Sequence, residues 1–305
     1  MAVSLNLTVG ILGDLSLGHA GFMCVGAFSS AFFTACMKDT ITNDLLRFIL
    51  AFVVAAVCAG ICGILIGIPV LRLKGDYLAI VTLAFGEIIM NIINALYIGR
   101  DENGFHFSME DSMSLNMSDS GKIIIKGAQG ITGTARQSTF TIGIILLLLT
   151  LVVVLNLMNS RSGRAIMSIR DNRIAAESVG IDVTKYKIMA FAISASLAGL
   201  AGCLYAHNLS SLTALPKNFG YNMSIMILVY VVLGGMANMR GSIIAAVLLT
   251  IIPELLREIG EYRMLIYAVI MIVMMIFNWS PKVREWRKAH SIKGAFHKKN
   301  VKEAE

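Results

Sequence analysis

Charged residues are scarce in this chain of 305 residues: they make up 15% of the sequence, while hydrophobic residues make up 56%. Soluble domains carry about 25% charged residues, so this balance and the mean hydropathy of +0.74 exclude an ordinary soluble protein. The apolar runs 45–68 and 140–157 approach or reach the roughly 20 residues needed to cross ~30 Å of hydrocarbon. The composition therefore predicts a polytopic integral membrane protein.

Three kinds of motif are also missing. No Gly-x-x-x-x-Gly-Lys-[Ser/Thr] sequence occurs, so the chain has no P-loop to hold ATP phosphates. No basic segment precedes the first apolar run, so no signal peptide is visible. The five cysteines give no disulfide framework, and Cys58 and Cys62 share a helix face without a nearby histidine or carboxylate. We therefore expect no metal site, no cofactor and no catalytic residue.

The apolar pattern predicts an all-α bundle of about eight to nine transmembrane helices, some of them broken or re-entrant. The expected spans are 2–13, 21–37, 47–68, 77–98, 139–159, 188–207, 222–239, 242–259 and 262–279. Glycine is abundant, with 27 residues, whereas proline occurs four times. Pairs of small residues four apart, such as Gly63 with Gly67 and Ala195 with Gly199, predict helices that approach closely in lipid.

The distribution of basic residues predicts the orientation in the membrane. Loop 160–187 carries six Lys/Arg against three Asp/Glu, and the tail 280–305 carries eight against three, so both are expected in the cytoplasm. The segment 99–138, with four Lys/Arg and five Asp/Glu, is then an extracytoplasmic loop. Residues 1–279 form the membrane domain. Nine spans would start the chain outside, so either the N-terminus is translocated or a preceding helix is missing from this sequence.

Polar residues interrupt the apolar pattern in a few places. Ser16, His19 and Phe22 belong to a break between the first two spans, and a second break covers 233–241. Non-helical backbone at membrane depth is tolerated where it is buried in protein or lines a cavity, and in transporters it often builds the substrate site. The two breaks resemble each other loosely, and both also fit ordinary interfacial turns.

The expected span 77–98 carries Glu87, Asn91 and Asn94 on one helix face. A carboxyl group inside a span is costly, so it should face protein or water. Glu87 and Asn91, with Ser16, His19 and Phe22, are the candidate lining of a translocation route. Hydrogen bonds between helices are the structural alternative.

Four stretches, spread over roughly residues 5–282, together resemble one family. They are 5–22, with Leu-Ser-Leu-Gly-His-Ala-Gly-Phe at 15–22; 71–83; loop 160–187 followed by Ala190-Phe191 and 198–202; and 233–235 with Gly241 and Pro253-Glu254. In these stretches the chain resembles the LivM-type permease of branched-chain amino-acid ABC importers. Members usually begin with at least one more helix, so the chain looks N-terminally short.

The resemblance implies a role for loop 160–187, which resembles the "EAA" coupling helix that docks onto an ATPase subunit. Its core here is Arg170, Ala175, Ala176, Glu177 and Gly180, and Ala-Ala-Glu replaces the usual Glu-Ala-Ala order. The segment 175–180 looks like one short helix. Asp171 is expected to cap its start, and Gly180 to supply a left-handed end. Without the resemblance, a plain positively charged inside loop would also fit.

The resemblance further implies a multi-pass protein of the bacterial cell membrane that moves leucine, isoleucine or valine inward. It would work with two ATP-binding subunits, a LivH-type second permease and an extracytoplasmic solute-binding protein, with ATP held by those partners. The basic tail could help retain anionic lipid or the ATPase, and a nucleic-acid partner is not expected. The alternatives are an ABC permease for a sugar or nucleoside, or an ion-coupled secondary transporter or channel.

Overall fold

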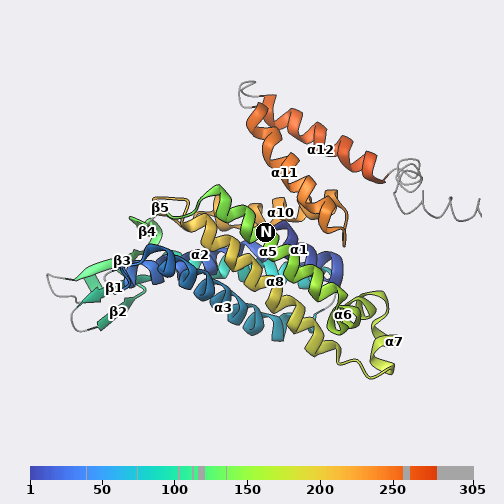
Figure 1. Cartoon of the computed structure of the whole chain (residues 1–305), viewed down its shortest axis with the longest axis horizontal. Coiled ribbons are helices and arrows are strands. Elements are labelled where there is room, and N and C mark those ends of the chain that lie inside the picture. Colours follow the sequence, from blue (N-terminus) through green and yellow to red (C-terminus); the bar gives the residue numbers. More distant parts are fainter. Residues whose placement is uncertain are drawn as a thin grey trace, which may run out of the picture.

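The computed structural model describes residues 1–38, 40–73, 75–101, 104–111, 113–115, 121–134, 136–256 and 262–279. These residues form a helical bundle with small β-sheets at one end and the short helices α6 and α7 at the other (Figure 1). The predicted helical membrane bundle is confirmed, and the strands are a feature that the sequence pattern did not predict. The predicted tail 280–305 lies outside the described residues.

The helices follow the predicted spans closely, with shifted ends. In chain order they are α1 (Ala2–Asn6), the π-helix η1 (Leu7–Leu12), α2 (His19–Cys36), α3 (Asp44–Val70), α4 (Asp76–Ala95), α5 (Phe140–Asn159), α6 (Arg161–Asp171), α7 (Arg173–Ser178), α8 (Val183–Ala206), α9 (Pro216–Phe219), α10 (Tyr221–Gly234), α11 (Met239–Leu255) and α12 (Arg263–Trp279). Among the described residues, five helices are long and apolar enough to cross a membrane, namely α2, α3, α4, α5 and α8. The other predicted spans are shorter helices.

Small residues bring α2, α3 and α8 together at the centre of the packing. A Cβ atom added to Gly63 of α3 would lie 2.6 Å from Cβ of Ala195 on α8. One added to Gly199 of α8 would lie 2.5 Å from Cβ of Ala59 on α3. The small pairs therefore do what the sequence predicted: they allow close backbone approach, which supplies dispersion attraction in lipid.

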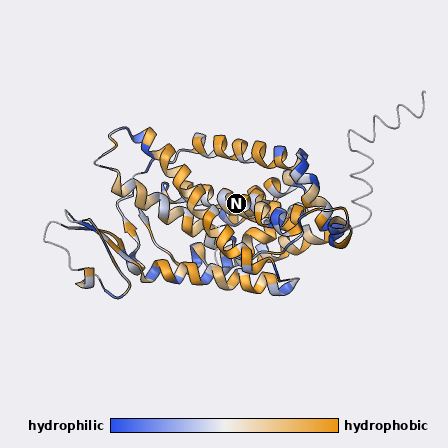
Figure 2. Ribbon diagram, turned by 90° about the horizontal axis from the view of Figure 1, so that it is seen from below, coloured by the Kyte–Doolittle hydropathy of each residue, from blue (hydrophilic) through white to orange (hydrophobic). Residues whose placement is uncertain are grey.

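The helix α5 is the opposite case. Its sequence is almost uniformly apolar, and Val154 is its one buried residue. Figure 2 shows the same apolar colouring along the helices, with hydrophilic segments towards the ends of the bundle. A helix that is apolar all round and packs little against protein is suited to contact with lipid or with another membrane protein.

The first helix lies in the middle of the bundle. All residues of α1 and η1 from Ala2 to Leu12 are buried, and the N-terminus lies near the centre of the view in Figure 1. Leu7 and Ile11 pack in one apolar cluster with Val154 of α5 and Ala190 of α8. A movement of this segment would therefore displace side chains on several helices.

The segment predicted as the loop 99–138 contains most of the β-structure. The strands β1 (Tyr97–Asp101), β2 (Gly104–Ser108) and β3 (Lys122–Lys126) form an antiparallel sheet in the order β2-β1-β3, while β4 (Ile131–Thr132) pairs with β5 (Ser211–Leu212). Short 3₁₀ turns, η2 (Met113–Leu115) and η3 (Gly127–Gln129), complete this end. Ile98 and Ile125 pack against Phe28 of α2. The predicted span 77–98 accordingly ends early, at Ala95, because its last residues start β1.

The predicted loop 160–187 is also mostly helical. It contains α6 and α7, and α8 begins at Val183 rather than at the predicted residue 188. Asp182 caps α8 by accepting a hydrogen bond from the Lys185 N–H, at 3.0 Å. The loop is therefore a folded unit that runs directly into a long helix.

Candidate coupling and translocation sites

The first break covers Gly13 to Gly18, between η1 and α2; Ser16 and Gly18 are buried, whereas Gly13 and Leu15 are exposed. The freed backbone N–H of Leu17 donates to Thr82 Oγ1 of α4 at 3.0 Å. The N–H of Ala20, in the first turn of α2, donates to Ser224 Oγ of α10 at 3.1 Å. Hydroxyl groups of two neighbouring helices thus satisfy backbone N–H groups at the break and at the start of α2.

The predicted route residues Ser16 and His19 are fully buried at this break. His19 Nε2 lies 3.0 Å from Ser194 Oγ of α8. The Ser194 hydroxyl donates to the Ser4 carbonyl and accepts from Thr8 Oγ1 at 2.8 Å. Because a hydroxyl has one hydrogen, this assignment makes His19 Nε2 the donor to Ser194. His19 Nδ1 and Ser16 Oγ are then buried without a hydrogen-bond partner among the described residues.

Phe22, the third predicted route residue at this break, belongs to the packed core. Its ring makes edge-to-face contacts with His19, at 5.9 Å between centroids, and with Phe191 of α8, at 5.5 Å. Such aromatic pairs contribute about 0.5–1.5 kcal/mol beyond their buried area. In this conformation the Phe22 ring fills space in the buried core next to the break.

Glu87 and Asn91 are held by different neighbours. The half-buried Glu87 accepts a 2.6 Å hydrogen bond at Oε1 from the N–H of Tyr221, the first residue of α10. A carboxylate there also meets the positive end of the helix dipole. Asn91 is exposed and donates to the Glu87 carbonyl, and Asn94 donates to the Ala214 carbonyl. Among the described residues, no hydrogen bond joins Glu87 or Asn91 to Ser16 or His19.

Asn6, which the sequence reading missed, links the first helix to the second break. Its fully buried side chain donates from Nδ2 to Ser242 Oγ at 2.8 Å and accepts from the Ala237 N–H at 2.9 Å. Ala237 has a positive φ of 64°, which a non-glycine residue rarely adopts. The sequence did carry a signal for this role, because Asn6 is an amide inside the first apolar run. The two breaks are therefore connected through α1.

The coupling-loop candidates lie on and around α7, which follows α6 after a one-residue corner. Asn172 caps α7 by accepting from the Ala175 N–H at 3.1 Å, so the prediction of Asp171 as the cap is wrong by one residue. Asp171 is the last residue of α6 and accepts instead from Arg170. Gly180 has the predicted left-handed conformation, with φ of 83°.

The two faces of α7 differ. Ala176 is buried with Ile169 and Val183 in a small apolar cluster, whereas Ala175, Glu177 and Gly180 are exposed. Ile174 is 80% exposed and Val179 is 74% exposed. The sequence reading missed these two, although an apolar residue in a hydrophilic loop was a visible signal. Exposed apolar side chains on an otherwise hydrophilic loop make this face a candidate interaction surface.

Arg170, another predicted coupling residue, points away from that surface. Its Nη1 donates to the carbonyl of Gly10 in η1 at 2.9 Å, and its side chain is 33% exposed. Nearby, Lys187 Nζ of α8 pairs with Asp14 Oδ2 of the first break at 2.6 Å. The base of the loop is thus attached to the bundle.

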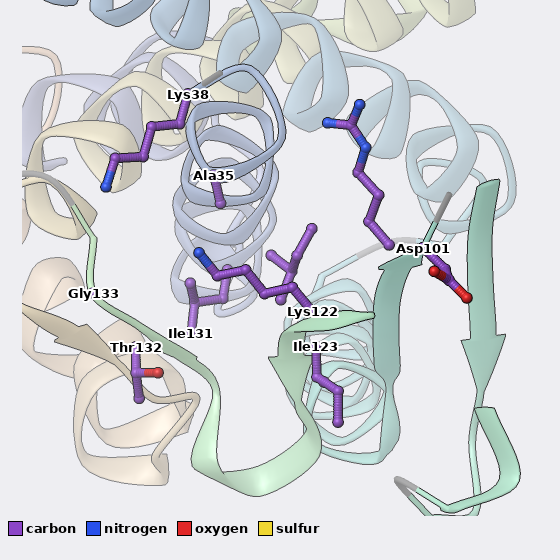
Figure 3. Close-up of a pocket in the computed structure, with 10 residues that line it drawn as sticks. Ala35, Lys38, Asp101, Lys122, Ile123, Ile131, Thr132 and Gly133 are labelled. Atoms are coloured by element: carbon purple, nitrogen blue, oxygen red, sulfur yellow. The ribbon is translucent and has the colours of Figure 1, made fainter. Parts of the chain in front are cut away.

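A basic pocket of about 380 Å³ lies at the sheet end. Figure 3 shows Lys38, just after α2, and Lys122 of β3 reaching toward the same hollow, which Ile131 and Thr132 border. Arg100 also lines it and donates to the Cys36 carbonyl at 2.7 Å. Asp101 also lines the pocket, so three basic side chains and one carboxylate meet at this end of the bundle.

The chain matches the family model described as "Branched-chain amino acid transport system / permease component" over residues 1–277. It is 35% identical over 293 residues to the high-affinity branched-chain amino acid transport system permease protein LivM of Salmonella typhimurium (strain LT2), covering 92% of this chain and 66% of that protein. LivM of Escherichia coli (strain K12) is 34% identical over 293 residues, again covering 92% of this chain and 66% of that protein.

A more distant relative is the fructose import permease protein FruG of Bifidobacterium longum. It is 26% identical over 151 residues, which is 46% of this chain and 43% of that protein. The chain spans 66% of the length of the LivM proteins of Salmonella and Escherichia. No solved structure matches the chain. The family match covers both breaks, the coupling loop and the helices around them, and the chain accordingly belongs to this family of multi-pass membrane permeases.

Proposed function

We propose that the chain is the transmembrane permease subunit of an ATP-binding-cassette importer for the branched-chain amino acids leucine, isoleucine and valine. The observation that carries this proposal is the similarity to LivM over 92% of the chain. The exposed apolar surface of α7 is a second support, because a permease without a P-loop needs a surface on which a separate ATPase can act.

Under this proposal residues 1–279 are the permease domain and the chain catalyses no reaction itself. Two partner subunits bind and hydrolyse ATP, a LivH-type permease completes the membrane unit, and a solute-binding protein delivers substrate from outside. The loop 160–187 and the tail 280–305 face the cytoplasm, while 99–138 faces outward in a bacterial cell membrane. The opposite placement of α7 and the sheets in Figure 1 fits this orientation, and the basic pocket offers acidic partner groups a contact.

The translocation route is proposed to run past the first break. Ser16, His19 and Phe22 contribute from that side, and Glu87 and Asn91 from α4. The support comes from two polar atoms, Ser16 Oγ and His19 Nδ1, which are buried without a hydrogen-bond partner in the described part of the chain. This is costly unless another conformation pairs them. The test is uptake by His19→Ala and Glu87→Gln. If both leave uptake and complex assembly intact, the route lies elsewhere.

A sugar is the second candidate substrate, because the chain is also similar to the fructose permease FruG. FruG has a lower identity and covers a smaller share of the chain than LivM does, which favours an amino-acid substrate. An ion-coupled transporter would leave Ile174 and Val179 without a docking partner.

Competitive uptake by cells expressing the whole importer tests the substrate. We expect unlabelled isoleucine and valine to displace labelled leucine, and fructose to have no effect. The control replaces the P-loop lysine of the ATPase subunits and should abolish uptake. Uptake that survives this control, or that fructose alone suppresses, would refute the proposed function.

A further inference from the structure

The contact between Arg170 and Gly10 joins the end of α6 to the end of the first helix. Gly10 lies in the last turn of η1, where helical carbonyl groups lack donors from their own helix. Arg170 supplies that donor from another part of the chain and brings a positive charge to the negative end of the helix. The guanidinium thus caps a helix that is itself buried at the centre of the bundle.

The fit at this point is close. Gly13, which ends η1, has φ of 82°, and a Cβ atom added there would lie 2.6 Å from Cγ of Arg170. The stem of Arg170 therefore packs directly on the turn that opens the first break. A displacement of α6 toward Gly13 would therefore push directly on this turn.

A second contact holds the same break from the other end of the loop. Lys187 Nζ and Asp14 Oδ2 are 2.6 Å apart, and their side chains are 11% and 18% exposed. An ion pair that water reaches poorly is screened less than an exposed one, and losing one partner leaves the other charge uncompensated. Asp14 follows Gly13 directly, so Arg170 and Lys187 contact adjacent residues of the break.

The segment between these two contacts is stiff. Asn172 caps α7, and the Ile181 N–H donates to the Ala176 carbonyl at 3.1 Å. Ile169 of α6, Ala176 of α7 and Val183 of α8 share one buried cluster. Since α6, α7 and the start of α8 pack on one another, a push on the exposed face of α7 reaches both contacts.

We propose that Arg170 and the Asp14–Lys187 pair are positioning residues that transmit displacement of α7 to the first break, where Ser16 and His19 lie. This rests on the proposed function, in which an ATPase acts on α7. It assigns Arg170 to the inner side of the coupling loop rather than to the ATPase contact. The break moves because both ends of the loop hold its first residues, with no direct contact between ATPase and route.

The test is the number of leucine molecules imported per ATP hydrolysed, in proteoliposomes containing the complete importer. Lys187→Met and Arg170→Met should keep the partner subunits and ATP hydrolysis but lower this ratio about tenfold or more. The swap Asp14→Lys with Lys187→Asp should recover at least part of the loss from Lys187→Met. Arg173→Met is the matched control, since Arg173 pairs within α7 with the exposed Glu177, and it should leave the ratio unchanged.

The wild-type complex separates the two claims. If it imports no branched-chain amino acid, the proposed function fails. If it does, but Lys187→Met and Arg170→Met keep the wild-type ratio, the transmission proposal is overturned. It is overturned equally if these variants only lower the amount of folded chain in the membrane and the charge swap restores nothing, because the contacts would then serve stability alone.

Discussion

The helices α6 and α7 belong to one loop and follow each other after a single residue, but their apolar side chains differ in exposure. α6 directs Ile166 and Ile169 into the protein, and Arg170 near its end reaches the carbonyl of Gly10. Ile174 of α7 and Val179, the residue just after α7, are exposed. One hydrophilic loop thus combines an inner half that contacts the bundle with an outer half that exposes apolar side chains to a partner.

The largest effect is expected at the outer half. Replacing Ile174 and Val179 together with aspartate should detach the ATPase subunits, because an apolar contact would have to desolvate two unpaired charges, and the few residues that dominate an interface cost about 2 kcal/mol or more when lost. Copurification of the ATPase with the chain measures this. The control pair Ile174→Leu and Val179→Ile keeps the apolar surface and should copurify normally. Full retention of the ATPase by the aspartate variant would mean that α7 is not the docking surface.

The next effect separates two glycines with the same backbone conformation. Gly13 and Gly180 have φ of 82° and 83°, so alanine strains both by roughly 1–2 kcal/mol. At Gly13 the new Cβ would meet Arg170, whereas no atom of the described residues lies within 4 Å of the corresponding position at Gly180. Thermal unfolding and uptake should therefore fall further for Gly13→Ala than for Gly180→Ala. Equal losses would show that contact with Arg170 adds nothing beyond backbone strain.

At Gly180 a bulkier side chain is expected to disturb coupling rather than insertion. Valine is β-branched, so in the left-handed region it should cost at least the roughly 1–2 kcal/mol of alanine and misplace the turn between α7 and α8. We expect ATP hydrolysis that is poorly coupled to uptake, with normal insertion and normal pairing with the second permease. Gly75→Val is the control, because Gly75 has φ of 61° and open space around it but lies before α4. If both variants couple normally, the shape of this turn does not matter.

The smallest effect belongs to Glu177→Lys. Its carboxylate pairs with Arg173 at 2.9 Å on an exposed face, and such pairs are typically worth under about 1 kcal/mol. ATPase binding should weaken only a few-fold, and the difference should shrink at high salt, since salt screens exposed charges. Binding measured at low and high ionic strength checks this. A loss larger than that of the double aspartate variant would reverse the proposed order of importance.

Much of the fold follows from the sequence because lipid imposes simple rules. Long apolar runs became α3, α5 and α8, small residues at Gly63 and Ala195 brought two of them together, and Gly180 has the left-handed conformation that its position after a short helix implied. The strands around 97–132 escaped prediction because they are short and irregular, and the buried Ile98 gains its place only by packing on α2.

The site was less predictable because its partners are backbone groups far away in sequence. Arg170 binds a carbonyl 160 positions earlier, Asn6 binds the N–H of Ala237, and Glu87 binds the N–H of Tyr221. Nothing in a residue's type indicates which distant backbone atom it will meet. The misplaced cap has a local reason: aspartate and asparagine are nearly equal at such positions, and Asp171 and Asn172 are adjacent.

The contrast between the two halves of the loop is tested most directly by measuring leucine import and ATP hydrolysis in the same proteoliposomes for Arg170→Ala and Ile174→Asp. We expect Arg170→Ala to keep hydrolysis and lose import, because the ATPase still docks but the break no longer follows. Ile174→Asp should lose both together, because fewer ATPase subunits remain bound. A parallel loss of import and hydrolysis in Arg170→Ala would contradict the division of the loop into an inner and an outer half.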